Sequence, residues 1–256
     1  PEKSKRRFPI IKSFYKYIFS FFTRIYTVSE SMKTKLTNII NDDKINVIGD
    51  TRIDQIEYRY ENKKIKLPLF ENSKNILFGS IDEYDIKIIF DYLKIRKNNS
   101  KLIFVPHEPD EKLIINIEKK LKELSIDSIR FSNMTDNLNQ DNLDAIIIDK
   151  VGILADAYQF SSISYIGCGF GKGVHNVMEP AIYGNLICFG PNYQILEEAI
   201  ELVNEKLAIS INNSNELTKV LDLISDMDTL EKYKNGLKKF ISKKQNISSQ
   251  ILRDML

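Results

Sequence analysis

Short apolar runs alternate with stretches of helical periodicity over most of this sequence, and that alternation constrains the fold more than any other feature. Strands that alternate with helices form a parallel, doubly wound sheet. Apolar runs without internal alternation are typical of strands buried on both faces. The sequence therefore predicts an α/β fold with strands at residues 76–78, 102–105, 128–131, 145–148, 163–166 and 186–189. Helices are expected at residues 83–96, 110–124, 152–160, 174–183 and 195–202, with two or three more within 213–256.

Polar residues cluster directly after several of the predicted strands. In a parallel sheet the carboxyl ends of the strands lie at one edge, and ligands bind at that edge. We therefore expect the clusters to form one shared site. Outside the glycine-rich loop, its candidate residues are Gly79, Ser80, Pro106, His107, Glu108, Val151, Gly152 and Ile153.

A glycine-rich loop at residues 167–173 separates the predicted strand at 163–166 from a predicted helix. Glycine lets a ligand approach the backbone closely, and a helix N-terminus attracts anions. Asn176 and Glu179 lie three residues apart and would share one helix face. The carboxylate can accept both ribose hydroxyls, while the amide and the backbone hold a phosphate. The loop therefore predicts a nucleotide site at Gly171, Gly173, His175, Asn176, Val177, Met178 and Glu179.

Some of these candidates also have a purely structural interpretation. Asn176 could cap the following helix, with Glu179 closing a capping box, although this leaves His175 and the glycine spacing unexplained. His107 could simply be a neighbour of the N-terminus of the helix that begins at Asp110. The two histidines are far apart in the sequence, and no HxxxH or Asp-x-Asp pair follows a strand, so we predict no metal site.

The first residues are strongly basic, although the whole chain is nearly neutral. Residues 1–24 carry seven Lys and Arg side chains against one Glu, a net charge of +6, and because the whole chain is +2 the remainder is −4. Lys12 and Lys16 interrupt the apolar residues between 8 and 22, so neither a transmembrane span nor a signal-peptide core fits. A helix on an anionic lipid surface and a helix packed in a further domain both fit. No nucleic-acid-binding motif accompanies the charge, so we expect no nucleic-acid partner.

A domain boundary is expected near residue 50, so the sequence before it is interpreted as the end of a separate domain. The sequence before residue 75 predicts one βαβ passage and then a linker, at residues 24–28, 30–40, 44–48 and 61–74. The chain begins at Pro1 rather than Met, so we expect it to be a piece of a longer protein. Cys168 and Cys188 form no CxxC motif, which favours a reduced, cytoplasmic compartment.

In this order the motifs resemble those of the Kdo transferases, which move 3-deoxy-D-manno-octulosonic acid (Kdo) from CMP-Kdo to the lipid A precursor. The resemblance covers nearly the whole chain but only the second half of the family protein. It implies that residues 1–50 are the tail end of an N-terminal, acceptor-side domain and that residues 51–256 are the C-terminal, CMP-Kdo-binding domain. It rests on Gly49-Asp50-Thr51-Arg52-x-Asp54, Gly79-Ser80, Pro106-His107-Glu108-Pro109, residues 149–154, Gly-x-His-Asn-x-x-Glu-Pro and Gly190-Pro191.

The resemblance also implies a mechanism and a location. Family members are inverting enzymes of GT-B type that need no metal or cofactor beyond the substrate CMP-Kdo, and they are peripheral on the cytoplasmic face of the inner membrane. Pro106 and His107 match positions that contact CMP. Residues 151–153 match the loop that holds the nucleotide, and residues 176–179 match the segment that binds its phosphate and ribose. Arg52 matches a lysine thought to stabilise charge in the transition state.

Two positions depart from the family pattern. The family's Pro-Arg-His is Pro-His-Glu here, which replaces a fixed cation by the titratable ring of His107, and Asp50 stands where the family has Asn. A neutral imidazole holds a phosphate less firmly than Arg does. The family's general base, a glutamate near the start of the first domain, has no counterpart in this chain. We therefore expect the chain alone to bind CMP weakly and to transfer no sugar.

Two other functions remain open from the sequence. One is another nucleotide-sugar enzyme of GT-B type, a UDP-sugar transferase or an epimerase, which a preference for UDP over CMP would indicate. The other is a noncatalytic lipid-surface module, in which residues 8–22 bind the membrane and the glycine-rich loop only packs. Liposome binding without any nucleotide binding would indicate that module.

Overall fold

The computed structural model describes residues 9–62, 65–71, 73–134 and 143–256, and the chain divides into two compact units. The first unit comprises the chain up to Gln55 together with Lys243–Leu256, and the second comprises Ile56–Ser242. The division falls inside helix α3 (Arg52–Glu61). The assignment of residues 1–50 to an acceptor-side domain and of 51–256 to a donor-binding domain stays a prediction.

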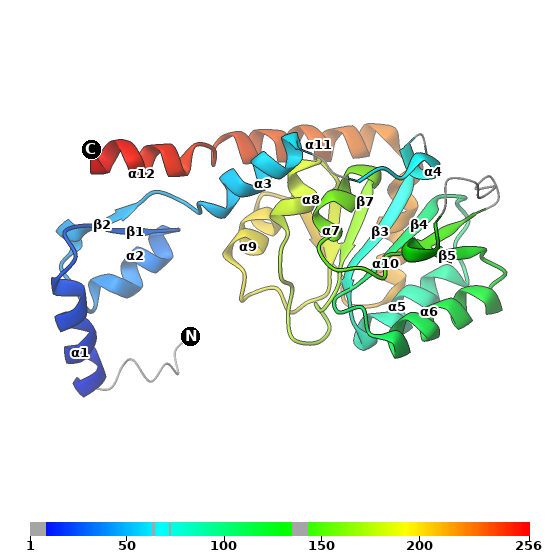
Figure 1. Ribbon diagram of the computed structural model, residues 1–256, viewed down its shortest axis with the longest axis horizontal. Coiled ribbons are helices and arrows are strands. Elements are labelled where there is room, and N and C mark those ends of the chain that lie inside the picture. The colour runs from blue at the N-terminus through cyan, green and yellow to red at the C-terminus, as the bar shows by residue number, and fades with distance from the viewer. Residues whose placement is uncertain (1–8, 63–64, 72, 135–142) are drawn as a thin grey trace. The chain divides into compact units, whose positions relative to one another are not determined.

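A seven-stranded sheet lies at the centre of the second unit (Figure 1). Its strand order is β5-β6-β4-β3-β7-β8-β9, and each neighbouring pair is parallel. The order reverses at β3, because β4 to β6 lie on one side of it and β7 to β9 on the other. The predicted α/β, doubly wound fold class is confirmed. The strands are β3 (Asn75–Ile81), β4 (Lys101–Pro106), β5 (Ser128–Arg130), β6 (Ala145–Ile147), β7 (Ile163–Ile166), β8 (Leu186–Phe189) and β9 (Ala208–Ser210).

Helix α5 (Glu83–Leu93) shows how the local sequence forms the helices that cover this sheet. Asp82 is its N-cap and accepts a hydrogen bond from Tyr84 N (2.9 Å), and Asp85 closes a capping box. Its apolar residues recur at helical spacing and are buried, at Ile86, Ile89, Phe90 and Leu93. The other described α-helices of this unit are α4 (Pro68–Glu71), α6 (Glu111–Glu123), α7 (Leu154–Ala157), α8 (Met178–Ile182), α9 (Glu197–Asn204), α10 (Ser214–Leu221) and α11 (Met227–Ser242).

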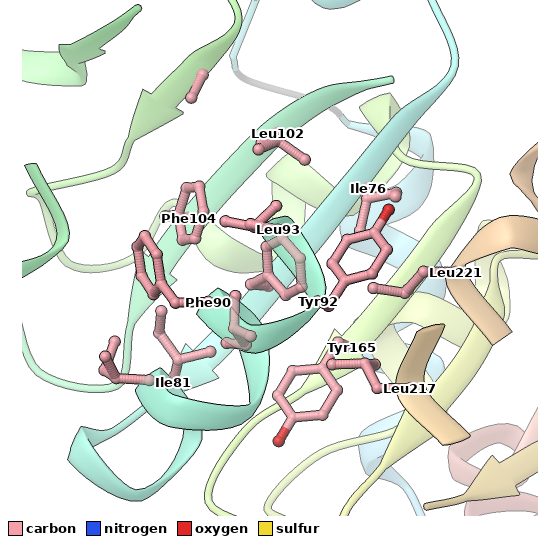
Figure 2. Close-up of a cluster of buried hydrophobic side chains, with 14 of the residues drawn as sticks. Ile76, Ile81, Phe90, Tyr92, Leu93, Leu102, Phe104, Tyr165, Leu217 and Leu221 are labelled. Atoms are coloured by element: carbon pink, nitrogen blue, oxygen red, sulfur yellow. The ribbon is translucent and has the colours of Figure 1, made fainter. Parts of the chain in front are cut away.

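The main core lies between the central strands and helices α5, α6 and α10. Phe78 of β3 stacks on Phe104 of β4 with ring centroids 5.0 Å apart, and Phe90 of α5 lies against the same ring. Figure 2 shows Phe90 beside Phe104, and Leu217 and Leu221 of α10 at the other end of the cluster. Burying a side chain of this size stabilises the fold by about 1.5–3 kcal/mol. The strands are therefore held firmly, and their carboxyl ends are fixed points for a site.

The first unit is built around a two-stranded parallel sheet. Asp54 accepts hydrogen bonds from Ile247 N (3.3 Å) and Ser248 N (2.6 Å), and the Tyr26 hydroxyl donates to Asp254 Oδ2 (2.6 Å). These bonds connect the last residues of the chain to the sheet region. No helix among the described residues has both the length and the apolar character needed to cross a membrane. The elements are α1 (Pro9–Ser20), β1 (Ile25–Thr27), α2 (Glu30–Thr37), β2 (Ile45–Val47) and α12 (Ile247–Met255).

Several elements differ from the sequence prediction. The helix expected at 174–183 shrinks to α8, because the Asn176 side chain caps the backbone only at Met178 and beyond. The helix expected at 152–160 is α7 followed by a 3₁₀ turn, and the linker expected at 61–74 contains α4. Strand β9 has no counterpart in the prediction, since it has three residues and forms by pairing with β8. Long-range pairing of this kind leaves no local pattern.

Candidate functional site

The predicted site residues of the second unit lie at the carboxyl ends of neighbouring strands. Gly79 and Ser80 belong to the end of β3, Pro106 ends β4, and His107 follows it. Residues 151–153 follow β6, and the glycine-rich loop follows β7. The four strands are adjacent in the order β6-β4-β3-β7. Because β3 and β7 flank the point where the strand order reverses, the candidates lie where open α/β sheets bind ligands.

A buried carboxylate, Asp85, connects the turns that follow β3 and β7. Its Oδ2 accepts hydrogen bonds from Asp82 N (2.9 Å) and Cys168 N (2.8 Å), and its Oδ1 accepts one from the Tyr165 hydroxyl (2.5 Å). Ser80 and Cys168 have φ angles of 52° and 63°. Such backbone conformations cost non-glycine residues roughly 1–3 kcal/mol each. Asp85 therefore stabilises two strained turns at the edge of the site.

Asp85 is not among the site residues predicted from the sequence. Burial raises the pKa of Asp85 to about 6, against the opposing hydrogen bonds from Tyr165 and from the backbone at Asp82 and Cys168. The sequence signal that could have found it is the spacing Asp82-x-x-Asp85 directly after a strand, which is a capping-box pattern. That pattern identifies a helix start, whereas the bond to Cys168 depends on the position of β7.

Two histidines from strands on either side of β3 meet above the strand ends. The rings of His107, after β4, and His175, after β7, are stacked with centroids 4.6 Å apart and an interplanar angle of 1°. The Cys168 Sγ lies beside them, and one ligand atom from each of the three residues lies within 4.8 Å of the others. The N-cap of α6 is Asp110. The fold thus places the His107 ring against the His175 ring. The position of His107 in the sequence, just before α6, does not predict this contact.

The surroundings of His175 favour its neutral imidazole. Burial lowers the pKa of His175, and His107 and Lys172 lower it further, while Asp82 opposes them. A neutral ring offers one N–H donor and one nitrogen lone pair. The pair can therefore donate to an anion or coordinate a cation.

The glycine-rich loop is closed by its own backbone. The N–H groups of Gly171 and Gly173 both donate to the Cys168 carbonyl oxygen, at 3.0 and 2.9 Å. Gly173 has a φ of +112°, and a Cβ on Gly167 would lie 2.5 Å from Ile81 Cα. The glycines are therefore needed for backbone conformation and close packing. These two N–H groups bond within the loop, rather than facing an anion as the glycine spacing suggested.

Asn176 acts as a helix cap. Its Oδ1 accepts hydrogen bonds from Met178 N (2.9 Å) and Glu179 N (3.3 Å). Helix α8 has five residues, and Val177 and Met178 are buried. Capping thus accounts for the side-chain oxygen of Asn176. The helix that follows is much shorter than the one on which the predicted anion site depended.

Glu179 lies in a different setting, among tyrosines and one arginine. Its Oε1 is 4.0 Å from Arg59 Nη1, and its side chain is 18% exposed. Burial raises the pKa of Glu179, Arg59 lowers it, and Asp156 raises it further. Burial also raises the pKa of Tyr183 to about 12, with a smaller contribution from Glu179. This partly accessible carboxylate, with a cation at the limit of ion-pair distance, can still accept hydrogen bonds from a ligand.

The remaining candidates are in exposed loops or in the other unit. Glu108 is exposed, and the Val151 side chain is 79% exposed beside Gly152, which has a φ of 82°. Arg52 belongs to the first unit, whereas the other candidates belong to the second. The Arg52 Nε donates to Asp50 Oδ2 (2.6 Å), and its Nη2 pairs with the same oxygen. The residue that replaces the family's Asn therefore binds the guanidinium.

The sheet topology is that of the domains found in proteins of GT-B fold. A crystal structure of the C-terminal CMP-Kdo binding domain of WaaA from Acinetobacter baumannii has a TM-score of 0.56, with 16% identity over 73% of this chain and 96% of that one. Anabaena Alr3699/HepE in complex with UDP also has a TM-score of 0.56, with 12% identity over 99% of this chain and 69% of that one. At these identities the likeness shows the fold.

The chain is similar in sequence to 3-deoxy-D-manno-octulosonic acid transferases, which confirms the resemblance predicted from the motifs. The enzyme of Rickettsia bellii is 27% identical over 259 residues, 94% of this chain and 59% of that protein. The enzyme of Chlamydia trachomatis serovar A is 24% identical over 97% of this chain and 59% of that protein. A bifunctional glycosyltransferase/methyltransferase of Fusobacterium nucleatum is 28% identical over 77% of this chain and 30% of that protein.

No family model matches this chain. The chain also spans only part of these curated relatives, about half the length of the Kdo transferases. The activity of the full-length relatives is therefore assigned to this chain only as a proposal.

Proposed function

We propose that this chain supplies the donor-binding half of a Kdo transferase, which moves Kdo from CMP-Kdo to the lipid A precursor in lipopolysaccharide biosynthesis. The observation that carries the proposal is the position of the His-Asn-x-x-Glu-Pro segment. This segment follows β7 beside the reversal of the strand order and brings His175 against His107. Similarity to Kdo transferases along 94% of the chain supports the same substrate.

In the proposed site, Glu179 accepts hydrogen bonds from the ribose hydroxyls of CMP. Its partial burial beside Arg59 excludes water from those bonds and strengthens them. The imidazoles of His107 and His175 donate to the phosphate. The exposed loop at residues 151–153 covers the nucleotide. These roles use the accessible polar groups and leave Asn176 as the cap that holds the segment in place.

The proposed reaction is a direct displacement with inversion and without a metal ion. A carboxylate base, which we expect in the first domain of the family, takes a proton from a glucosamine hydroxyl of the lipid. The hydroxyl oxygen bonds to the anomeric carbon of Kdo, and the bond from that carbon to the CMP oxygen breaks with its electron pair going to CMP. The imidazole donors stabilise the charge that develops on the leaving phosphate. The role of Arg52 in stabilising that charge stays a prediction from the resemblance.

Calorimetric titration with CMP and with UMP tests this proposal. We expect CMP to bind more tightly than UMP, and Glu179→Ala to weaken CMP binding at least tenfold, about 1.4 kcal/mol. Glu231→Ala, an exposed glutamate on α11, is the matched control and should leave affinity unchanged. Equal or tighter binding of UMP would favour another nucleotide-sugar enzyme. Absence of nucleotide binding by the folded chain would reject the donor-site assignment.

We further propose that α1 associates peripherally with the cytoplasmic face of the inner membrane. Phe14 and Tyr17 of this helix are exposed, as are Phe21 and Phe22 just after it, and Lys12 and Lys16 can face anionic headgroups. The exposed fractions are 59% for Phe14, 65% for Tyr17, 70% for Phe21 and 50% for Phe22. Phe21→Ser should reduce sedimentation with anionic vesicles, whereas Tyr84→Ser, an equally exposed aromatic in the second unit, should not. Equal loss in both variants would contradict a specific role for this helix.

A further inference from the structure

We propose that His107, Cys168 and His175 together bind one transition-metal ion of the zinc class at the carboxyl ends of β4 and β7. The three residues offer two imidazole nitrogens and one sulfur, and these ligand atoms lie within 4.8 Å of one another. This donor set suits zinc and related ions. Neither the sequence patterns nor the proposed transfer reaction calls for such a site, so it stands on this geometry.

The distances are within reach of metal coordination. Zinc binds sulfur at about 2.3 Å and imidazole nitrogen at about 2.0 Å, so ligand atoms around a tetrahedral ion lie roughly 3.5 Å apart. The histidine side chains are exposed and can rotate to close the remaining gap of about an ångström. Cys168 is fixed, because its N–H donates to Asp85 (2.8 Å) and its Sγ–H donates to the Ser80 carbonyl (3.2 Å). The site therefore has one rigid ligand and two adjustable ones.

The charges around Cys168 favour a cation. The Asp82 and Asp85 carboxylates belong to the turn beside Cys168, and Asp85 accepts a hydrogen bond from Cys168 N (2.8 Å). The carboxylates that disfavour a bare thiolate attract a divalent ion, and a bound metal ion reverses the local preference by deprotonating the sulfur. When the metal–sulfur bond forms, the thiol proton passes to solvent.

Three protein ligands leave one coordination position for water or an anion. Because the same imidazoles are those we propose for the donor phosphate, bound zinc is expected to change the affinity for CMP. That consequence rests on the proposed function. The metal site itself does not, so its test uses no nucleotide.

Titration of the full chain with Co²⁺ tests the site, because a cobalt–thiolate bond gives a charge-transfer absorption band in the near ultraviolet. We expect the band to saturate at one ion per chain and to disappear when Zn²⁺ is added. Cys168→Ser should abolish the band. His107→Ala and His175→Ala should each weaken zinc affinity at least tenfold. Cys188→Ser is the matched control, since Cys188 is buried in β8, and it should keep the band.

Thermal unfolding without metal establishes that each variant is folded. The exposed histidine variants keep the test decisive if Cys168→Ser proves unstable. Absence of the band in the wild-type chain would overturn the proposal. It would also be overturned by zinc affinity that is unchanged in both histidine variants, or by equal loss of the band in Cys188→Ser. Loss of CMP binding would bear only on the proposed function.

Discussion

Asp85 and Glu179 are two acidic side chains near the same strand ends, and burial raises the pKa of both, yet their surroundings differ. Asp85 is fully buried and accepts three hydrogen bonds, from Tyr165 and from two backbone N–H groups. Glu179 keeps 18% of its side chain exposed, and the Arg59 guanidinium lies 4.0 Å away. The hydrogen-bond acceptors of Asp85 are thus occupied by donors of the folded chain, whereas Glu179 can still accept hydrogen bonds at the surface.

The comparison shows that burial alone does not distinguish a structural acid from a binding acid. Desolvation acts on both groups in the same direction. The distinguishing property is how many donors the folded chain already supplies. A carboxylate with its donors in place stabilises the protein, whereas one with few donors can exchange water for a ligand.

Asp85→Ala should lower the free energy of unfolding by about 4 kcal/mol, because it leaves buried donors unpaired at roughly 1–3 kcal/mol each without strict additivity. Asp85→Asn should cost less, since its oxygen can accept both N–H bonds and its amide can donate to Tyr165. Urea denaturation measures both. Asp91→Ala is the control on the same helix, where the carboxylate pairs with two exposed lysines, and it should cost below about 1 kcal/mol. A cost for Asp85→Ala no greater than for this control would refute the structural role of Asp85.

The contribution of Asp85 to the stability of the protein should fall as pH rises from about 4 to about 6. Burial raises the pKa of Asp85 from 3.8 to about 6, so the folded chain holds a proton that the unfolded chain has released. The folded state therefore binds more protons in this window, and the free energy of unfolding decreases with pH. The contribution is at most about 3 kcal/mol, at 1.36 kcal/mol per pH unit. Asp85→Asn should remove this part of the slope, and an unchanged slope would contradict the assignment.

Glu179→Gln should weaken ligand binding without lowering stability, whereas substitutions at Asp85 should lower stability. The amide keeps the size of the side chain and removes a partly buried charge, so we expect the urea midpoint to stay constant or rise slightly. CMP affinity should fall about tenfold, near 1.4 kcal/mol, because charge-assisted bonds to the ribose are lost. A fall in stability without a fall in affinity would reverse the comparison and make Glu179 a structural acid.

Tyr165→Phe should have the smallest effect, about 1 kcal/mol, because it removes one of the three donors to Asp85 while preserving the ring in the core. Loss of that donor should raise the pKa of Asp85 further and shift the pH dependence of unfolding upward. Tyr92→Phe is the control, since its hydroxyl accepts a bond from Asn98 instead. Its pH dependence should match the wild-type protein, and an equal shift in both variants would show that the tyrosine–carboxylate bond is unimportant.

Local sequence patterns predicted much of the fold. The apolar runs predicted six of the seven strands, because burial on both faces forces continuous apolar sequence. The missed strand, β9, has three residues and depends on its pairing with β8. The helix expected at 174–183 was too long, since periodicity does not reveal which residue caps a helix. The first error came from pairing with a distant strand, and the second came from a local cap that periodicity does not report.

The sequence by itself determined the α/β class, the placement of the candidates at strand ends and the resemblance to Kdo transferases, because these depend on residue order and on patterns within single segments. Only the tertiary structure decided which candidates meet. His107 and Cys168 are brought together because β4 and β7 flank β3, and Asp85 gains two of its three donors, Tyr165 and Cys168, because β7 lies beside β3. Contacts between distant segments follow from strand order, which no local pattern encodes. These contacts distinguish the residues that stabilise the site from those that can bind a ligand.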